Sequence, residues 1–186
     1  RRRQRQMCIR DSHKSLAAEF PESFDPLVPD ELVYTGTKKL QDTVDGVPLD
    51  AGKLVLSPTR TYAPVMKTIL EKLGNAAIHG AVHCSGGAQT KVLHFIDNGH
   101  IIKDNMFPIP PLFQMIQAES KTDWREMYKV FNMGHRLELY ISPEHASQLI
   151  AIAKSFYIDA QIIGRVEESS TKKLTLTTPN GIFEYA

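Results

Sequence analysis

Residues 78–91 read IHGAVHCSGGAQTK, and this run sets the class of fold that the rest of the chain must fit. Residues 78–84 are apolar enough for a buried strand, residues 85–88 form a glycine turn, and residues 89–96 can continue as a helix. A strand that leads through a glycine turn into a helix is typical of folds that combine sheets with helices.

The segments on the N-terminal side extend this pattern. Residues 53–56 predict a short apolar strand, and Ser57-Pro58 then supplies a side-chain cap and a proline at the first helical position. A helix should follow and end at Gly74. Its apolar face holds six residues at helical spacing: Tyr62, Val65, Met66, Ile69, Leu70 and Leu73.

The segments on the C-terminal side also mix strands and helices. Ser142-Pro143 repeats the signal of a cap followed by a proline, and Pro179-Asn180-Gly181 is a good hairpin turn. The helix after Ser142-Pro143 has an apolar face of Ala146, Leu149, Ile150, Ala153 and Phe156. The expected strands are residues 100–105, 136–141, 161–166, 174–177 and 182–185, and the other expected helices are residues 112–118 and 124–130.

This order of elements allows an α+β or an α/β sandwich. We predict the α+β class, as a layered sandwich of a mixed, largely antiparallel sheet with helices. A chain of 186 residues, 42% of them hydrophobic, can bury one sizeable core. No run of about 18 apolar residues occurs, so we expect no membrane span. Two cysteines are too few for a disulfide framework, and we expect a cytoplasmic protein with reduced thiols.

The first twelve residues, RRRQRQMCIRDS, differ in composition from everything that follows. We interpret residues 1–12 as the translation of a sequencing-adapter end or a cloning artefact; a basic arm that binds nucleic acid is the alternative. Removing their five arginines and one aspartate changes the formal charge from +1 to −3, so no basic patch argues for nucleic acid. Residues 13–50 read as the end of a helix and a connector, and residues 51–186 as the domain.

The glycine turn is the strongest candidate for a ligand site. Glycines between a strand and a helix let backbone N–H groups approach an anion at the positive end of the helix, which makes Gly86 and Gly87 candidate phosphate-binding residues. The hydroxyls of Ser85 and Thr90 could add donors. A tight turn that binds nothing is an equally good interpretation of this short motif.

Two other segments are candidate ligand contacts. Thr59-Arg60 is expected in the first turn of a helix, where a guanidinium can clamp a phosphate or a carboxylate, although a surface salt bridge is the alternative. Gly134, two residues after Asn132, stands before a strand at a place where backbone can pass close to a ligand. A plain loop explains that segment equally well.

His79, His83 and Cys84 do not predict a metal site. On one strand the two histidines lie about 13 Å apart, at ~3.3 Å per residue, which one ion cannot bridge. Cys84 points to the opposite face from His83. Packed or hydrogen-bonded histidines are the better interpretation, and we expect no metal ligands in this chain.

Three stretches together resemble the family of aminoimidazole ribonucleotide (AIR) synthetases, the phosphoribosylformylglycinamidine cyclo-ligases. They are LSPTRTY at residues 56–62, IHGAVHCSGG at residues 78–87 and MYKVFNMG at residues 127–134, in the order and separation of the family. The resemblance runs from about Ser15 to the C-terminus, looks closest to the form found in Bacteroidetes-like bacteria, and implies a fold like the AIR synthetase C-terminal domain.

The resemblance is incomplete around the turn. His83 and the two glycines match, whereas Ser85 replaces a threonine and Ala88 replaces a third glycine. The asparagine, proline and arginine that commonly follow are absent, which leaves Lys91 as a replacement cation. His135-Arg136 stands where the family commonly has a small apolar run.

The resemblance implies a two-domain subunit that works as a homodimer, with an expected preceding N-terminal domain that holds most of the ATP and Mg²⁺. The implied reaction uses ATP to phosphorylate the formyl amide oxygen of formylglycinamidine ribonucleotide, and the amidine nitrogen then closes the imidazole ring. Residues and resemblance together nominate these substrate- or phosphate-binding residues: Thr59, Arg60, His83, Ser85, Gly86, Gly87, Thr90, Lys91, Asn132 and Gly134. His83 should shape the loop rather than transfer a proton, and no catalytic residue is identified.

Two alternatives stay open at the level of the sequence. Selenophosphate synthetase, thiamine-monophosphate kinase, a hydrogenase maturation protein and formylglycinamidine ribonucleotide synthase share the two-domain superfamily and also use ATP. A non-catalytic fragment or interaction module that keeps only this fold is the other alternative.

Overall fold

The structure is a computed structural model that describes residues 37–39, 41–57 and 60–186. The chain divides into two compact units, which are residues 1–58 with 109–127, and residues 59–108 with 128–186. The expectations for residues 1–12, for most of residues 13–50 and for Thr59 lie outside the described residues. None of the helices in the described part of the chain has the length and apolar character to span a bilayer.

The first unit contains helix α4 (Ala51–Leu56) and helix α6 (Pro111–Ser120), and helix α7 (Trp124–Val130) begins in it. The prediction of a strand over residues 53–56 is wrong, because these residues belong to α4. The Asp50 carboxylate accepts a hydrogen bond from the Lys53 N–H at 2.8 Å and caps the helix, as an N-cap aspartate does. A short apolar run cannot be assigned to strand or helix by periodicity alone.

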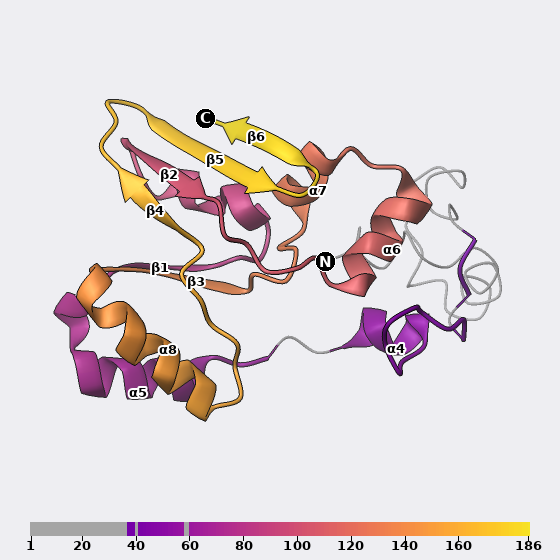
Figure 1. Ribbon diagram of the computed structural model, residues 1–186, viewed down its shortest axis with the longest axis horizontal. Coiled ribbons are helices and arrows are strands. Elements are labelled where there is room, and N and C mark those ends of the chain that lie inside the picture. Colours follow the sequence, from indigo (N-terminus) through magenta and orange to yellow (C-terminus); the bar gives the residue numbers. More distant parts are fainter. Residues whose placement is uncertain (1–36, 40, 58–59) are drawn as a thin grey trace, which may run out of the picture. The chain divides into compact units, whose positions relative to one another are not determined.

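The second unit has a helix pair packed on a two-stranded ribbon. Strand β1 (Ile78–His83) pairs antiparallel with strand β3 (Leu137–Ile141), and helices α5 (Ala63–Leu73) and α8 (Ala146–Ser155) lie side by side against it (Figure 1). Val65, Ile69 and Ile152 form the buried centre of this layer. The apolar face predicted for residues 62–73 is therefore confirmed as a packing face at five of its six positions, and the prediction is wrong for Leu70, which is exposed.

A four-stranded sheet forms the other layer of the second unit. Its order is β4 (Gly164–Glu167), β2 (Gly99–Lys103), β5 (Lys172–Thr178) and β6 (Gly181–Tyr185). The pair β2–β5 is parallel and the pairs β4–β2 and β5–β6 are antiparallel. This arrangement confirms the predicted α+β class with a mixed, largely antiparallel sheet. The predicted hairpin at residues 179–181 joins β5 to β6.

Gly164 lets β4 approach β2 closely. A Cβ atom built at this position would lie 1.8 Å from the backbone oxygen of Ile102, so any other residue would push the edge strand away. The strand predicted over residues 161–166 accordingly begins three residues later, at Gly164.

Three local predictions need correction. Helix α5 begins at Ala63 with Pro64 in its first turn, rather than at the Ser57-Pro58 signal, so Arg60 precedes the helix. Strand β1 alternates in exposure and is not buried throughout. The helix after the glycine turn is a 3₁₀ helix, η3 (Ala88–His94), shorter than the expected residues 89–96.

Candidate functional site

The glycine turn leaves two backbone amides open. Gly87 takes the left-handed conformation with φ 84°, and the Ala88 N–H donates to the Ser85 carbonyl at 3.1 Å to close the turn. Among the described residues, the N–H groups of Gly86 and Gly87 have no hydrogen-bond acceptor. Both donors therefore remain free for a ligand.

The other amides at the turn are already used. The Ser85 N–H donates to the His83 carbonyl at 2.8 Å, and the Thr90 N–H donates to the Gly87 carbonyl at 2.9 Å. The Thr90 hydroxyl donates to the same Gly87 carbonyl at 2.9 Å. The structure thus assigns Thr90 to support of the turn, although the sequence nominated it as a ligand contact.

Lys91 holds its ammonium group against the turn. Its Nζ donates to the Ser85 Oγ at 2.7 Å and to the His83 carbonyl at 3.0 Å. An ammonium group has three protons, so one of them has no acceptor among the described residues. The Ser85 hydroxyl and the Lys91 cation therefore lie together where the sequence predicted a replacement cation.

Arg60 reaches a different place. Its guanidinium donates to the Tyr157 carbonyl at 2.6 Å, just beyond the C-terminal end of α8, where backbone carbonyls favour a cation. Thr59 lies outside the described residues. The prediction that Arg60 sits in the first turn of a helix is wrong, and its guanidinium is engaged by the backbone after α8.

The Tyr62 ring packs against His83 of strand β1, close to two arginines. Burial raises the pKa of the Tyr62 hydroxyl, and the charges of Arg136 and Arg60 oppose that rise. The Tyr62 and His83 rings make an edge contact with centroids 6.2 Å apart. Arg136 is thus a second cation near this edge of the ribbon. The sequence nominated Asn132 and Gly134 in the preceding loop, but not Arg136.

The loop over residues 132–134 lies next to the turn. The Gln89 Nε2 donates to the Asn132 carbonyl at 2.8 Å, and the Asn132 Oδ1 accepts the Gly134 N–H at 3.0 Å. Gly134 has φ 98°, and the non-glycine Met133 has φ 51°. The structure therefore brings the two predicted segments together, but it uses the Asn132 side chain within its own loop.

A buried polar cluster, made of Lys103, Glu138, Gln89 and Tyr140, lies between the ribbon and the sheet. The Lys103 Nζ and the Glu138 Oε1 are 2.6 Å apart, and their side chains are 2% and 4% exposed. Lys103 also donates to the Gln89 side-chain oxygen at 3.0 Å, and the Tyr140 hydroxyl donates to the Glu138 Oε2 at 3.1 Å. Sequence reasoning missed this cluster.

The position of Lys103 in its strand could have revealed the buried polar cluster from the sequence. Residues i and i+2 of a strand share a face, so Lys103 shares the face of the buried Ile101. A lysine on a core face requires a buried partner. Glu138 gives no such signal, because it stands between Leu137 and Leu139, and a charged residue between two apolar ones in a strand is usually exposed.

The titratable groups around the cluster are neutral. Burial lowers the pKa of His135 to about 4, and its Nε2 accepts the Phe107 N–H at 3.1 Å. Burial, with a smaller effect of the Glu138 charge, raises the pKa of the Cys84 thiol to about 12. Burial likewise raises the pKa of Tyr140. None of these groups offers a thiolate or a charged imidazole at neutral pH.

The described residues contain no group of three or more His, Cys, Asp or Glu side chains that could hold a metal ion. The His79 Nε2 lies 3.5 Å from the Ser142 hydroxyl oxygen.

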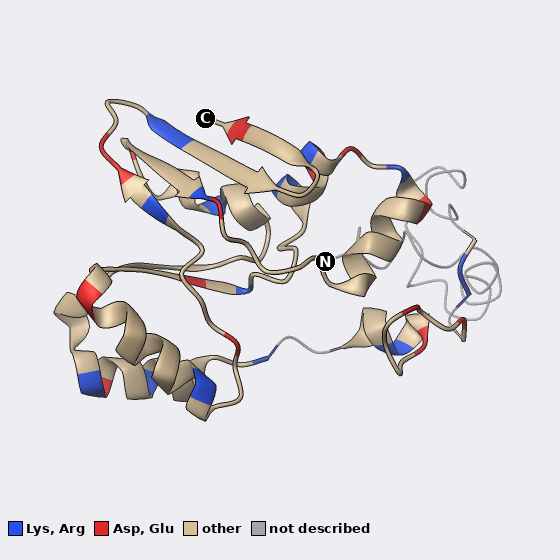
Figure 2. Cartoon of the chain, in the orientation of Figure 1, with Lys and Arg blue, Asp and Glu red and all other residues tan. Residues whose placement is uncertain are grey.

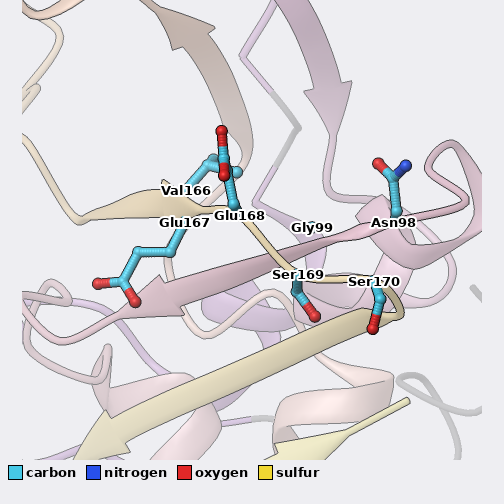
Figure 3. Close-up of a pocket in the computed structure, with 7 residues that line it drawn as sticks. All are labelled: Asn98, Gly99, Val166, Glu167, Glu168, Ser169 and Ser170. Atoms are coloured by element: carbon cyan, nitrogen blue, oxygen red, sulfur yellow. The ribbon is translucent and has the colours of Figure 1, made fainter.

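Acidic and basic residues are interspersed over the second unit in Figure 2. No nominated site residue lines the open hollow in Figure 3, where the Glu167 and Glu168 side chains point apart.

Comparisons with known proteins agree with the resemblance. The family model described as "AIR synthase related protein, C-terminal domain" matches residues 33–177. The chain is 31% identical over 143 residues to a phosphoribosylformylglycinamidine cyclo-ligase of Syntrophus aciditrophicus, covering 72% of the chain and 39% of the relative. It is 34% identical to one of Methanococcus vannielii, covering 65% of the chain and 35% of the relative.

A third relative is the cyclo-ligase of Geobacillus thermodenitrificans, which is 34% identical over 139 residues. This match covers 69% of the chain and 38% of the relative. The chain thus spans less than half the length of the curated relatives that it matches. The predicted likeness to an AIR synthetase C-terminal domain is confirmed, and the likeness to a Bacteroidetes-like form stays a prediction.

Proposed function

The chain belongs to the AIR synthase related family, whose C-terminal domain it carries, and from this premise we propose that it forms the C-terminal part of a phosphoribosylformylglycinamidine cyclo-ligase. The proposed enzyme uses ATP to convert formylglycinamidine ribonucleotide into aminoimidazole ribonucleotide, a step of purine biosynthesis. One observation carries the proposal for this chain: two open glycine amides lie beside a held ammonium group in the segment that resembles the family.

The chemistry requires a poor leaving group to be activated. An amide oxygen leaves poorly and a phosphate leaves readily, so transfer of a phosphoryl group from ATP prepares ring closure. The protein then has to orient the amidine nitrogen and stabilise the developing charge. In this chain, the Gly86 and Gly87 N–H groups with Lys91 would hold a phosphate of the ribonucleotide or of ATP.

Lys91 supports this role better than Arg60 does. The Lys91 ammonium lies within hydrogen-bonding distance of the Ser85 hydroxyl, so it faces the same turn as the open amides. The Arg60 guanidinium is bound to the Tyr157 carbonyl and would have to leave that acceptor before it could bind phosphate. We therefore rank Arg60 behind Lys91 as a phosphate contact.

Mg²⁺ and most ATP contacts belong to a separate domain in this proposal. The described residues provide no acidic cluster that fits a divalent cation, so no step is assigned to a metal on this chain. We also propose that the enzyme is a cytoplasmic homodimer that binds neither nucleic acid nor a membrane.

Binding of ATP and of formylglycinamidine ribonucleotide to this chain alone can be measured by isothermal titration. A titration without a binding signal would favour a non-catalytic module.

The ring-closure reaction gives the direct test. In the full-length enzyme that carries this chain, Gly87→Val should raise KM for the ribonucleotide or abolish turnover, because a side chain at φ 84° disturbs the turn. Gly74→Val is the control for backbone strain elsewhere, since Gly74 also has a positive φ (78°) and lies at the end of α5, away from the turn. Equal kinetics for both variants would remove the turn from the site.

His83 can be tested in the same assay. We expect His83→Asn to leave the shape of the pH–rate profile unchanged, because His83 contacts Tyr62 through its ring and Lys91 through its backbone carbonyl. A profile that loses one ionisation would instead make His83 a proton-transfer group.

A further inference from the structure

We propose that Lys103 and Glu138 are positioning residues, which hold the glycine turn and the loop over residues 132–134 in one fixed arrangement. The proposal rests on the proposed function, because the turn is assigned to the ligand there and the loop holds Asn132 and Gly134, which the sequence nominated as ligand contacts. Neither Lys103 nor Glu138 is open to a ligand, since their side chains are 2% and 4% exposed. Any role in binding must therefore act through the residues that they contact.

The contacts of Lys103 point to Gln89. Its Nζ donates to the Gln89 side-chain oxygen at 3.0 Å and to the Gln89 backbone carbonyl at 3.1 Å, and it pairs with the Glu138 Oε1 at 2.6 Å. All three ammonium protons thus have acceptors. Because two of those acceptors belong to Gln89, Lys103 fixes both the side chain and the backbone of that residue.

Gln89 links the two ligand segments. It lies two residues after Gly87 at the start of η3, and its Nε2 donates to the Asn132 carbonyl at 2.8 Å. Its side chain is fully buried, so its amide has no water to use instead. Lys103 sets which way the Gln89 amide points, and that direction determines whether the turn and the loop are joined.

Glu138 keeps the lysine in place from the other side. Its Oε1 accepts from Lys103, and its Oε2 accepts from the Tyr140 hydroxyl at 3.1 Å on the same strand. The Lys103–Glu138 salt bridge is the ion pair of this cluster, and the neighbouring His135, Cys84 and Tyr140 are uncharged at neutral pH. The pair is directional and each oxygen of the carboxylate is used.

Stability alone does not explain such a pair. Moving two charges out of water is costly, and replacing a buried ion pair by well-packed apolar residues often leaves stability unchanged or increases it. A directional pair is better suited to specifying one arrangement among several. This difference separates a positioning role from a purely structural role, because the two roles predict different behaviour for an apolar replacement of both residues.

The test compares the wild-type 186-residue chain with the double variant K103M/E138L. Gln89→Leu is the second variant, because it keeps the ion pair and removes only the side-chain link to Lys103 and Asn132. Ile69→Val, in the layer between α5 and α8, is the control that perturbs the core elsewhere. The readouts are the melting temperature, the amide NMR positions of Gly86, Gly87 and Asn132 without ligand, and the dissociation constant for inorganic phosphate.

The positioning role predicts that K103M/E138L and Gln89→Leu both stay folded and both shift the amides of Gly86, Gly87 and Asn132. Phosphate affinity should fall by about tenfold or more in each, because a small misplacement of binding groups is costly. Ile69→Val should leave those amides and the affinity unchanged. Folded variants with unmoved turn and loop amides would overturn the proposal.

The readouts keep this proposal separate from the proposed function. A wild-type chain that does not bind phosphate would remove the ligand from the turn, whereas the amide positions without ligand would still decide whether Lys103 and Glu138 fix the turn. If K103M/E138L does not fold, Gln89→Leu decides alone, since it leaves both charges paired.

Discussion

The two faces of the β1–β3 ribbon are built in opposite ways. On one face, Leu139 packs against the apolar centre formed by Ile69 and Ile152. On the other face, Glu138 and Tyr140 join the buried polar cluster with Lys103. Apolar packing supplies stability in proportion to the area that it removes from water, with little dependence on direction. The polar face contributes direction, and through Lys103 it contacts Gln89, two residues after Gly87.

The largest expected loss of stability comes from removing the lysine of the polar face. Lys103→Met leaves the Glu138 carboxylate buried without its cation and should lower the free energy of unfolding by about 3–5 kcal/mol. Urea unfolding of the 186-residue chain measures this loss. The double variant K103M/E138L should recover most of it, and a double variant as unstable as the single one would contradict the account.

The next largest loss of stability should come from truncating Ile69 on the apolar face. Ile69→Ala should cost about 3 kcal/mol, because Ile69 is 2% exposed and its removal leaves a cavity between α5 and α8. The amide positions of Gly86 and Gly87 should not change in this variant. Displaced turn amides in a folded Ile69→Ala chain would show that the two faces are not separable.

The polar side of the ribbon should also make stability depend on pH, through the buried His135. Burial holds the pKa of His135 at about 4, below the 6.5 of an exposed histidine, so the unfolded chain binds the proton more strongly. Stability from this group is full above pH 6.5 and is lost as the pH falls toward 4, by on the order of 2–3 kcal/mol.

The measurement is urea unfolding at pH 7 and at pH 5 for the wild type and for His135→Leu. The difference between the two proteins isolates the histidine from the carboxylates, which also titrate in acid. His135→Leu should weaken the dependence on pH in this range. The same dependence in both proteins would mean that His135 is not buried as the structure has it.

The smallest effect concerns the turn itself. Gly87→Ala should cost about 1 kcal/mol, because Gly87 lies in the left-handed region, where an alanine is strained. Gly74→Ala should cost more, about 1–3 kcal/mol, because φ 78° with ψ 164° is a conformation essentially confined to glycine. Equilibrium unfolding measures both losses. Only Gly87→Ala should weaken phosphate binding, and equal binding by both variants would contradict the assignment of the turn.

The apolar side of the fold was predictable from periodicity. The helical spacing from Tyr62 to Leu73 predicted the face of α5, and the turn at residues 179–181 predicted the β5–β6 hairpin. The glycine turn was predictable too, because glycines between a strand and a helix have a clear conformational reason. These features depend on neighbours within a few residues along the chain.

The polar side was not predicted, because its partners are distant in the sequence. Lys103 lies 14 residues from Gln89 and 35 from Glu138, and no local pattern reports that they meet. The prediction of a strand over residues 53–56 failed for a different reason. The helix cap from Asp50 outweighs the strand tendency of a short apolar run. Hydrophobic periodicity gives no information about long-range pairing or about helix capping.

Phosphate binding by the open amides of the turn can be followed residue by residue in an NMR titration. A chain labelled with ¹⁵N-glycine contains 11 glycines, which report on many parts of the fold at once. On titration with inorganic phosphate, the amides of Gly86 and Gly87 should move most and should saturate. Unmoved Gly86 and Gly87 signals at phosphate concentrations that shift other glycines would contradict the account.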